Sequence, residues 1–171
     1  MKLEPRSINL FLRKDEAATA FVYKKTSGLL FHIAFGILRD ESLAEEAMLD
    51  AYVSLFGKPV SFENDKAFIA YLCEATRNAS LSLLEKRKET LPLEEEEVGQ
   101  NEKNRDTGLL DLMEKTLGKE DFDIFFLHVN EELSFPEISL YLKLGSPSSV
   151  RSRYFRAKKT LQTVLKKEGI L

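Results

Sequence analysis

Basic side chains recur along the last part of the chain, where their type and spacing suit the binding of an anionic polymer. The recurring residues are Arg151, Arg153, Arg156, Lys158 and Lys159. Residues 134–171 carry 8 Lys and Arg against 2 Asp and Glu, whereas residues 91–133 carry 4 against 13. The formal net charge of −3 therefore conceals a basic C-terminal end. Because a local basic patch attracts phosphates whatever the total charge, this end is a candidate for DNA binding.

These charges fall on the second of two predicted helices that a tight turn joins. Ser134 and Glu137 have the spacing of a capping box, which begins a helix. Gly145 suits the end of that helix, and Pro147 after Ser146 suits the first turn of the next. Apolar residues form one stripe along the second helix, at Val150, Tyr154, Ala157, Leu161, Val164 and Leu165. This layout is that of a helix-turn-helix, whose second helix can lie in a major groove.

A plainer interpretation applies to the same residues. Helical hairpins are common, and a basic C-terminal helix is often only a solvated face. The concentration of positive charge in residues 134–171 favours DNA binding over that interpretation.

The rest of the chain is predicted to be helical, so the expected fold class is all-α. Apolar spacing indicates helices over about 15–38, 42–56 and 64–88, with shorter ones at about 107–117 and 119–130. Ser27-Gly28 is expected to break or bend the first helix. Ser42 with Glu45 forms a second capping-box pattern. Either Asn64 or Asp65 is expected to cap the next helix.

Residues 90–106 differ from the segments on either side. Four consecutive glutamates, Glu94 to Glu97, are followed by a polar stretch. Low hydrophobicity and like-charge repulsion favour a flexible acidic linker. The sequence therefore predicts two small helical modules, residues 1–89 and residues 107–171, joined by that linker.

Catalytic and metal-binding patterns are missing from the sequence. The two histidines, His32 and His128, lie far apart, and the single cysteine, Cys73, cannot form an internal disulfide. No glycine-rich phosphate loop is present. We therefore expect no enzyme, no metal and no cofactor. Neither a membrane-spanning run nor a signal peptide is found, which predicts a cytoplasmic protein without membrane insertion.

Two motifs resemble a known family. Leu133-Ser134-Phe135-x-Glu137-Ile138 and Val150-Arg151-Ser152-Arg153-x-Phe155-Arg156-Ala157-Lys158 resemble the promoter-recognition module of bacterial RNA polymerase sigma factors of the extracytoplasmic-function group, within the sigma-70 superfamily. Ala44-Glu45-Glu46 through Tyr52 resembles the helix with which that family docks on polymerase. Phe68-x-x-Tyr71-Leu72 through Arg77-Asn78 resembles its helix for recognising and melting the −10 element.

For the C-terminal module, the resemblance implies binding to the −35 element. Base edges and phosphates would be contacted by Arg151, Ser152, Phe155 and Arg156. Phosphates would be neutralised by Arg153, Lys158 and Lys159. His128 stands where the family can carry a DNA-contacting basic residue.

For the N-terminal module, the resemblance implies contact with polymerase and with separated DNA. Glu46, Leu49 and Asp50 would face the clamp helices of core RNA polymerase, and Leu49 replaces a glutamine that is usual in the family. Arg77 and Asn78 would lie along the separated strand, and loop 58–65 would receive a flipped-out base. Three residues depart from the family's basic or aspartate residues on the strand-binding helix, namely Glu74, Ser82 and Glu85.

The function that the resemblance implies is promoter-specific initiation by a non-enzymatic subunit. Its partners would be core RNA polymerase, through the clamp helices and the flap, promoter DNA, and an anti-sigma protein. Two alternatives stay open. One is a sigma-like decoy that binds an anti-sigma protein and no DNA, although the arginines at 151, 153 and 156 argue against it. The other is a stand-alone helix-turn-helix regulator, against which the N-terminal module argues.

Overall fold

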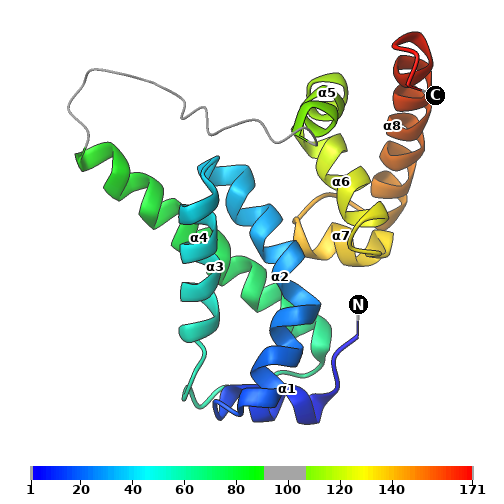
Figure 1. Ribbon diagram of the computed structural model, residues 1–171. Helices are drawn as coiled ribbons and strands as arrows, with labels where there is room; N and C mark the ends of the chain where they lie inside the picture. Colours follow the sequence, from blue (N-terminus) through cyan, green and yellow to red (C-terminus); the bar gives the residue numbers. More distant parts are fainter. Residues whose placement is uncertain (1, 91–106, 171) are drawn as a thin grey trace. The chain divides into compact units, whose positions relative to one another are not determined.

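The computed structural model describes residues 2–90 and 107–170, and in these residues it contains helices and no strand (Figure 1). The all-α fold class is thereby confirmed. The helices are α1 (Pro5–Leu12), α2 (Glu16–Leu38), α3 (Glu41–Val53), α4 (Asp65–Thr90), α5 (Thr107–Leu117), α6 (Lys119–Val129), α7 (Phe135–Tyr141) and α8 (Pro147–Lys167). The chain divides into two compact units, Met1–Glu96 and Glu97–Leu171. Of the predicted linker 90–106, Thr90 ends α4 and the remainder lies outside the described residues.

In unit 1, α2, α3 and α4 pack against one another around a common apolar core. The predicted break in α2 at Ser27-Gly28 is wrong, because α2 is a single helix. Residues on both sides of that dipeptide are fully buried, among them Thr26 and Leu29. Packing of both halves outweighs the cost of about 1 kcal/mol that one glycine carries in a helix.

The start of α3 also differs from the prediction. Asp40 is the N-cap, and its side chain accepts a hydrogen bond from the Leu43 amide at 3.0 Å. Ser42 already lies inside the helix, so Ser42 and Glu45 do not form a capping box. An aspartate caps as well as a serine does, and its charge suits the positive end of the helix. For α4 the predicted cap is confirmed, because the Asn64 side chain accepts from the Ala67 amide at 2.9 Å.

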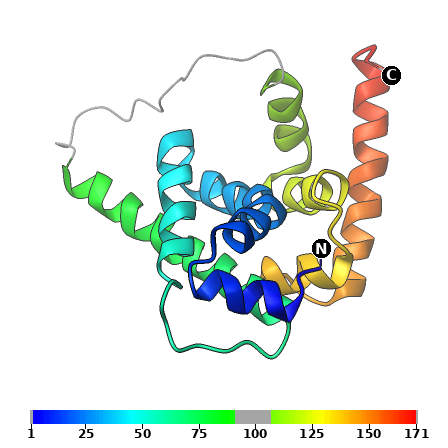
Figure 2. The ribbon, with the colours of Figure 1, turned by 60° about the horizontal axis from the view of Figure 1, so that its bottom comes forward.

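The short helix α1 was not predicted, and it closes one end of unit 1 beside the loop that joins α3 to α4 (Figure 2). The ring of Phe11 is 1% exposed and packs against Tyr52, Phe56 and Phe68 at centroid distances of 6.1, 5.1 and 5.6 Å. Backbone bonds add to this contact, because the carbonyl of Leu12 accepts from the amide of Gly57 at 3.0 Å. The N-terminal segment thus holds both ends of that loop.

Helix α4 buries a wider face than the sequence indicated. The apolar spacing of this segment predicts one inner stripe, formed by Phe68, Leu72, Ala75, Ala79 and Leu83. Of these residues, Phe68 and Leu72 are buried, whereas Ala75, Ala79 and Leu83 are only half-buried. The remaining buried positions of the helix are Ile69, Cys73, Thr76 and Ser80. Because α4 packs against both α2 and α3, it buries two adjacent stripes rather than one.

Unit 2 confirms the predicted capping signals. The Ser134 hydroxyl accepts from the Glu137 amide, and the Glu137 carboxylate accepts from the Ser134 amide at 2.8 Å. Burial raises the pKa of Glu137, but hydrogen bonds from Ser134 outweigh it and hold the pKa below its ordinary value. Ser146 caps α8, with Pro147 in the first turn. The chain turns after α7 at Lys143 (φ 54°) rather than at the predicted Gly145.

The aromatic contacts of Phe11 predict that truncating its side chain strongly destabilises the protein. Phe11→Ala should lower the free energy of unfolding by about 3–5 kcal/mol, because it leaves a cavity among three aromatic rings. Urea denaturation followed by circular dichroism measures this change. Phe21→Ala is the control, since Phe21 is 40% exposed and should lose much less. Equal losses in the two variants would contradict this account of α1.

The thiol of Cys73 should be inert in the folded protein. Burial raises its pKa to about 12, so at pH 8 only on the order of 1 in 10,000 thiols is ionised. Titration with a disulfide reagent should give no reaction within minutes in buffer and one thiol per chain in urea. Rapid reaction without denaturant would show that the α4 face opens readily.

Candidate nucleic-acid and protein interfaces

The outer face of α8 gathers most of the predicted DNA-contacting residues. Six of them are exposed, namely Arg151, Ser152, Phe155, Arg156, Lys158 and Lys159. Helix α8 packs its buried stripe, Val150, Tyr154, Ala157 and Leu161, against the other helices of unit 2. The guanidinium carbon of Arg151 lies 5.8 Å from the centroid of the Phe155 ring, and that ring is 51% exposed. This face offers paired donors for a guanine, an apolar edge for a thymine methyl group, and ammonium groups for phosphates.

Arg153 is placed differently from its neighbours on α8. Its side chain is only 24% exposed, and its Nε donates to Asp121 at 2.5 Å. A second guanidinium nitrogen pairs with Glu120 at 2.8 Å. The family resemblance implied that Arg153 neutralises phosphates, whereas in the structure its guanidinium pairs with two carboxylates of α6. No local sequence pattern reveals this pairing, because the partners are 32 and 33 positions away.

His128 also lies within the packing of unit 2. Its Nδ1 is 2.7 Å from the carbonyl oxygen of Leu133, the residue before the cap of α7. Its ring stacks on Phe135 at 4.5 Å and meets Tyr154 edge to face at 4.6 Å. His128 is half-buried and joins α6, α7 and α8. A contact of its ring with DNA stays a prediction.

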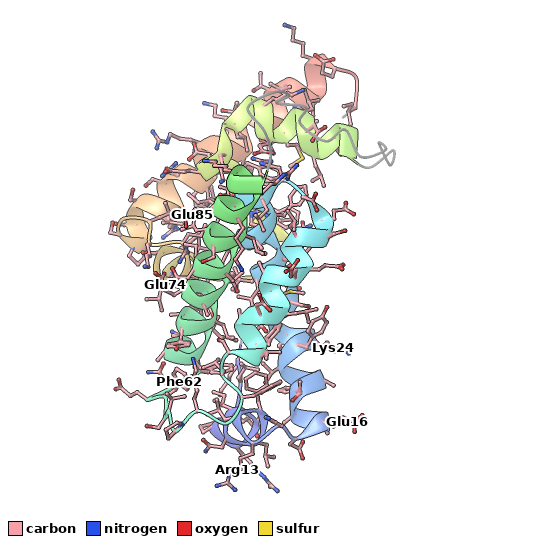
Figure 3. The ribbon with its side chains drawn as sticks, turned by 90° about the vertical axis from the view of Figure 1, so that its left-hand side faces the viewer. Arg13, Glu16, Lys24, Phe62, Glu74 and Glu85 are labelled. Carbon is pink, nitrogen blue, oxygen red and sulfur yellow. The ribbon has the colours of Figure 1, made fainter. Side chains whose placement is uncertain are left out.

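In unit 1, Arg77 and Asn78 lie on the outer part of α4. Asn78 is exposed, while the guanidinium of Arg77 forms an ion pair with Glu74 at 2.9 Å. Figure 3 shows Glu74 partway along α4 and Glu85 nearer its C-terminal end. The outer surface of α4 therefore mixes carboxylates with the two residues that the sequence assigned to a DNA strand.

Aromatic rings cluster at the start of α4, where Phe62 joins Phe68 and Tyr71 of the motif that the sequence pointed to. Phe62, in the loop before the helix (Figure 3), contacts Phe68 at 5.2 Å and Tyr71 at 5.5 Å. Tyr71 is 40% exposed. An exposed ring with fixed neighbours can serve as a platform on which a nucleobase stacks. The sequence pointed to this place through loop 58–65 and the motif that begins at Phe68, but not to the contacts of Phe62.

The outer face of α3 joins acidic and apolar side chains. Glu46, Leu49 and Asp50 are all exposed, as predicted for a docking surface, and Leu49 is 50% exposed. Val53, which the sequence analysis did not include, is 60% exposed one turn further along. Beside the end of α3 lies an open pocket of about 520 Å³ with a mainly apolar lining, formed by Lys14, Glu16, Thr19, Ala20, Tyr23 and Phe56. These features suit a protein partner better than a small ligand.

Residues 22–90 match the family model described as Sigma-70 region 2. This match supports a sigma factor of the sigma-70 family. The matched residues cover most of α2 and all of α3 and α4, while α1 and unit 2 lie outside them. No curated protein sequence matches the chain.

The match assigns a broad role to unit 1. Sigma-70 region 2 takes part in promoter recognition and melting by RNA polymerase, so core polymerase and promoter DNA are the implied partners. Sigma factors are non-enzymatic subunits. Among the described residues, no helix is long and apolar enough to cross a membrane. Within the same residues, His, Cys, Asp and Glu do not gather into a group that could hold a metal ion.

Proposed function

We propose that this chain is a sigma factor of the extracytoplasmic-function type, acting in the cytoplasm. Unit 1 binds core RNA polymerase and opens the −10 element, and unit 2 binds the −35 element. The observation that carries the proposal is the Sigma-70 region 2 match, which covers the three packed helices of unit 1. An anti-sigma protein that holds the factor inactive is a further proposed partner.

Binding of the −35 element is supported by α7 and α8, which act as a helix-turn-helix. Residues 142–146 join the two helices, and the exposed face of α8 is free of the packing of unit 2. Arg151 and Arg156 read base edges, and Phe155 contacts a thymine methyl group. Lys158 and Lys159 neutralise phosphates, which supplies affinity that falls with salt.

Docking on polymerase is supported by the exposed face of α3. A partner helix that covers Leu49 and Val53 removes their apolar surface from water. This burial stabilises the complex by about 25 cal/mol for each Å² of apolar surface. Glu46 and Asp50 flank this apolar surface and attract a basic partner, such as the clamp helices.

Strand opening is supported by the rings at the start of α4. Extruding a base from the duplex costs a few kcal/mol. Stacking on an aromatic side chain such as Tyr71 returns about 1–3 kcal/mol per base, and Phe62 holds that ring in place. Asn78 and Arg77 then lie along the separated strand, with Glu74 reducing the charge that Arg77 offers.

Transcription in vitro tests the proposal as a whole. Core polymerase with the purified chain and a genomic DNA library should give defined RNA start sites that share two upstream elements. Arg151→Ala should reduce starts that depend on the upstream element by about tenfold or more, since one bidentate base contact is worth about 1–3 kcal/mol. Core binding should stay unchanged. Core binding without transcripts would point to a missing activator or to defective melting. The absence of core binding would favour the decoy or the stand-alone regulator.

A capture experiment tests the α3 surface separately. The double variant Leu49→Ala with Val53→Ala should weaken capture of core polymerase about tenfold, or roughly 1.4 kcal/mol, because two exposed apolar side chains are truncated. Phe21→Ala removes a similarly exposed apolar side chain outside the proposed surface and should leave capture unchanged. Equal weakening in both variants would show that α3 is not the docking face.

A further inference from the structure

Arg153 is held inside unit 2 while the other basic residues of the α8 outer face are exposed. Its side chain is 24% exposed, and its guanidinium meets Asp121 through Nε at 2.5 Å and Glu120 at 2.8 Å. Its pKa is raised above the ordinary value, because the two carboxylates outweigh the burial that lowers it. A planar guanidinium that binds two carboxylates at once has a fixed orientation, which a single ammonium contact does not impose.

The partners of Arg153 make the contact a link between two helices. Glu120 and Asp121 both lie in the first turn of α6, where the helix dipole stabilises negative charge. Ion pairs confined to one helix leave its rotation undetermined, whereas this one ties α8 to α6. Tyr154, the residue after Arg153, packs against Phe125 and His128, which also belong to α6.

The position of this link on α8 gives it a consequence for DNA recognition. Arg153 lies within one turn of Arg151 and Arg156. A rotation of α8 about its axis would move both of these side chains away from the base edges that they read. An ion pair at this turn therefore opposes such a rotation, in addition to the packing of the buried stripe of α8.

We propose that Arg153 is a positioning residue, whose ion pairs with Glu120 and Asp121 hold α8 in the orientation that reads the upstream promoter element, and that it does not neutralise a phosphate. The proposal rests on the proposed function of α8 in DNA binding. It assigns Asp121 and Glu120, which carry the same charge as DNA, a supporting role in DNA recognition.

Asp121→Asn separates the two possible roles of Arg153 by the sign of its effect. If Arg153 were a phosphate ligand that the carboxylate restrains, removing the negative charge would strengthen DNA binding. If Arg153 is a positioning residue, the same change loosens α8 and weakens binding, by roughly tenfold for the loss of a charge-assisted hydrogen bond. Arg153→Gln should weaken binding to a similar extent, and the double variant should be little worse than either single variant.

The salt dependence of binding supplies an independent criterion. The full chain with core polymerase is titrated with a duplex that carries the upstream element mapped by transcription, over a series of salt concentrations. Loss of one phosphate contact lowers the slope of log affinity against log salt by about 0.9. The control Lys159→Gln should show that reduction, whereas Arg153→Gln should lower affinity at every salt concentration with the slope of the wild type.

The outcomes distinguish this proposal from the proposed function. A reduced slope for Arg153→Gln, or stronger binding by Asp121→Asn, would overturn the positioning role while α8 remained a DNA-binding helix. A wild-type complex that does not prefer the mapped duplex over a scrambled one would overturn the proposed function itself. Arg153→Lys keeps the charge but not the two-pronged geometry, so it tests the role even where Arg153→Gln fails to fold. It should weaken binding with an unchanged slope.

Discussion

Burial of α4 against α2 and α3 is the constraint on which unit 1 depends. Phe68, Ile69 and Leu72 are fully buried, and packing against α2 and α3 buries two adjacent stripes of α4. Whatever α4 offers to a partner must come from the face that remains, which carries Tyr71 and Asn78. The same packing fixes the start of α4 beside Phe62. The core of unit 1 therefore selects the residues that are available for DNA.

In unit 2 as well, the packing between helices determines which residues are exposed. The ring of Tyr154 contacts Phe125, His128 and Phe135 at 5.8, 4.6 and 5.4 Å, and so joins α8 to α6 and α7. Tyr154 is buried, whereas the ring of Phe155, the next residue, is 51% exposed and lies on the outer face. The contacts of Tyr154 thus help to set the side of α8 that faces the other helices of unit 2, together with Val150, Ala157 and Leu161.

Charge is used differently on the two candidate DNA-contacting helices. On α8 the charged residues that are exposed are all basic, and Arg153, which pairs with carboxylates, is only 24% exposed. On α4 the pair between Arg77 and Glu74 lies at the surface, with side chains 22% and 42% exposed. A surface pair of this kind contributes little to stability, so its main effect is on the field that a DNA strand would meet.

The sequence by itself determined the features that depend on neighbours a few residues apart. The capping box of Ser134 and Glu137, the start of α8 at Pro147, and the exposed basic face of α8 all follow from local spacing, which also narrowed the cap of α4 to Asn64 or Asp65. A cap needs only a side chain three residues from an amide, and an apolar stripe needs only helical periodicity.

Tertiary structure decided everything that joins distant residues. Packing made α2 continuous through Gly28, and the ring cluster around Phe11 fixed α1 against the core of unit 1. The ion pairs of Arg153 cannot be predicted from its sequence neighbours, because both partners belong to α6. From the local sequence alone, Arg153 resembles the phosphate-binding residues around it. A charge pattern states which groups are present, but only the fold determines which of those groups are already paired.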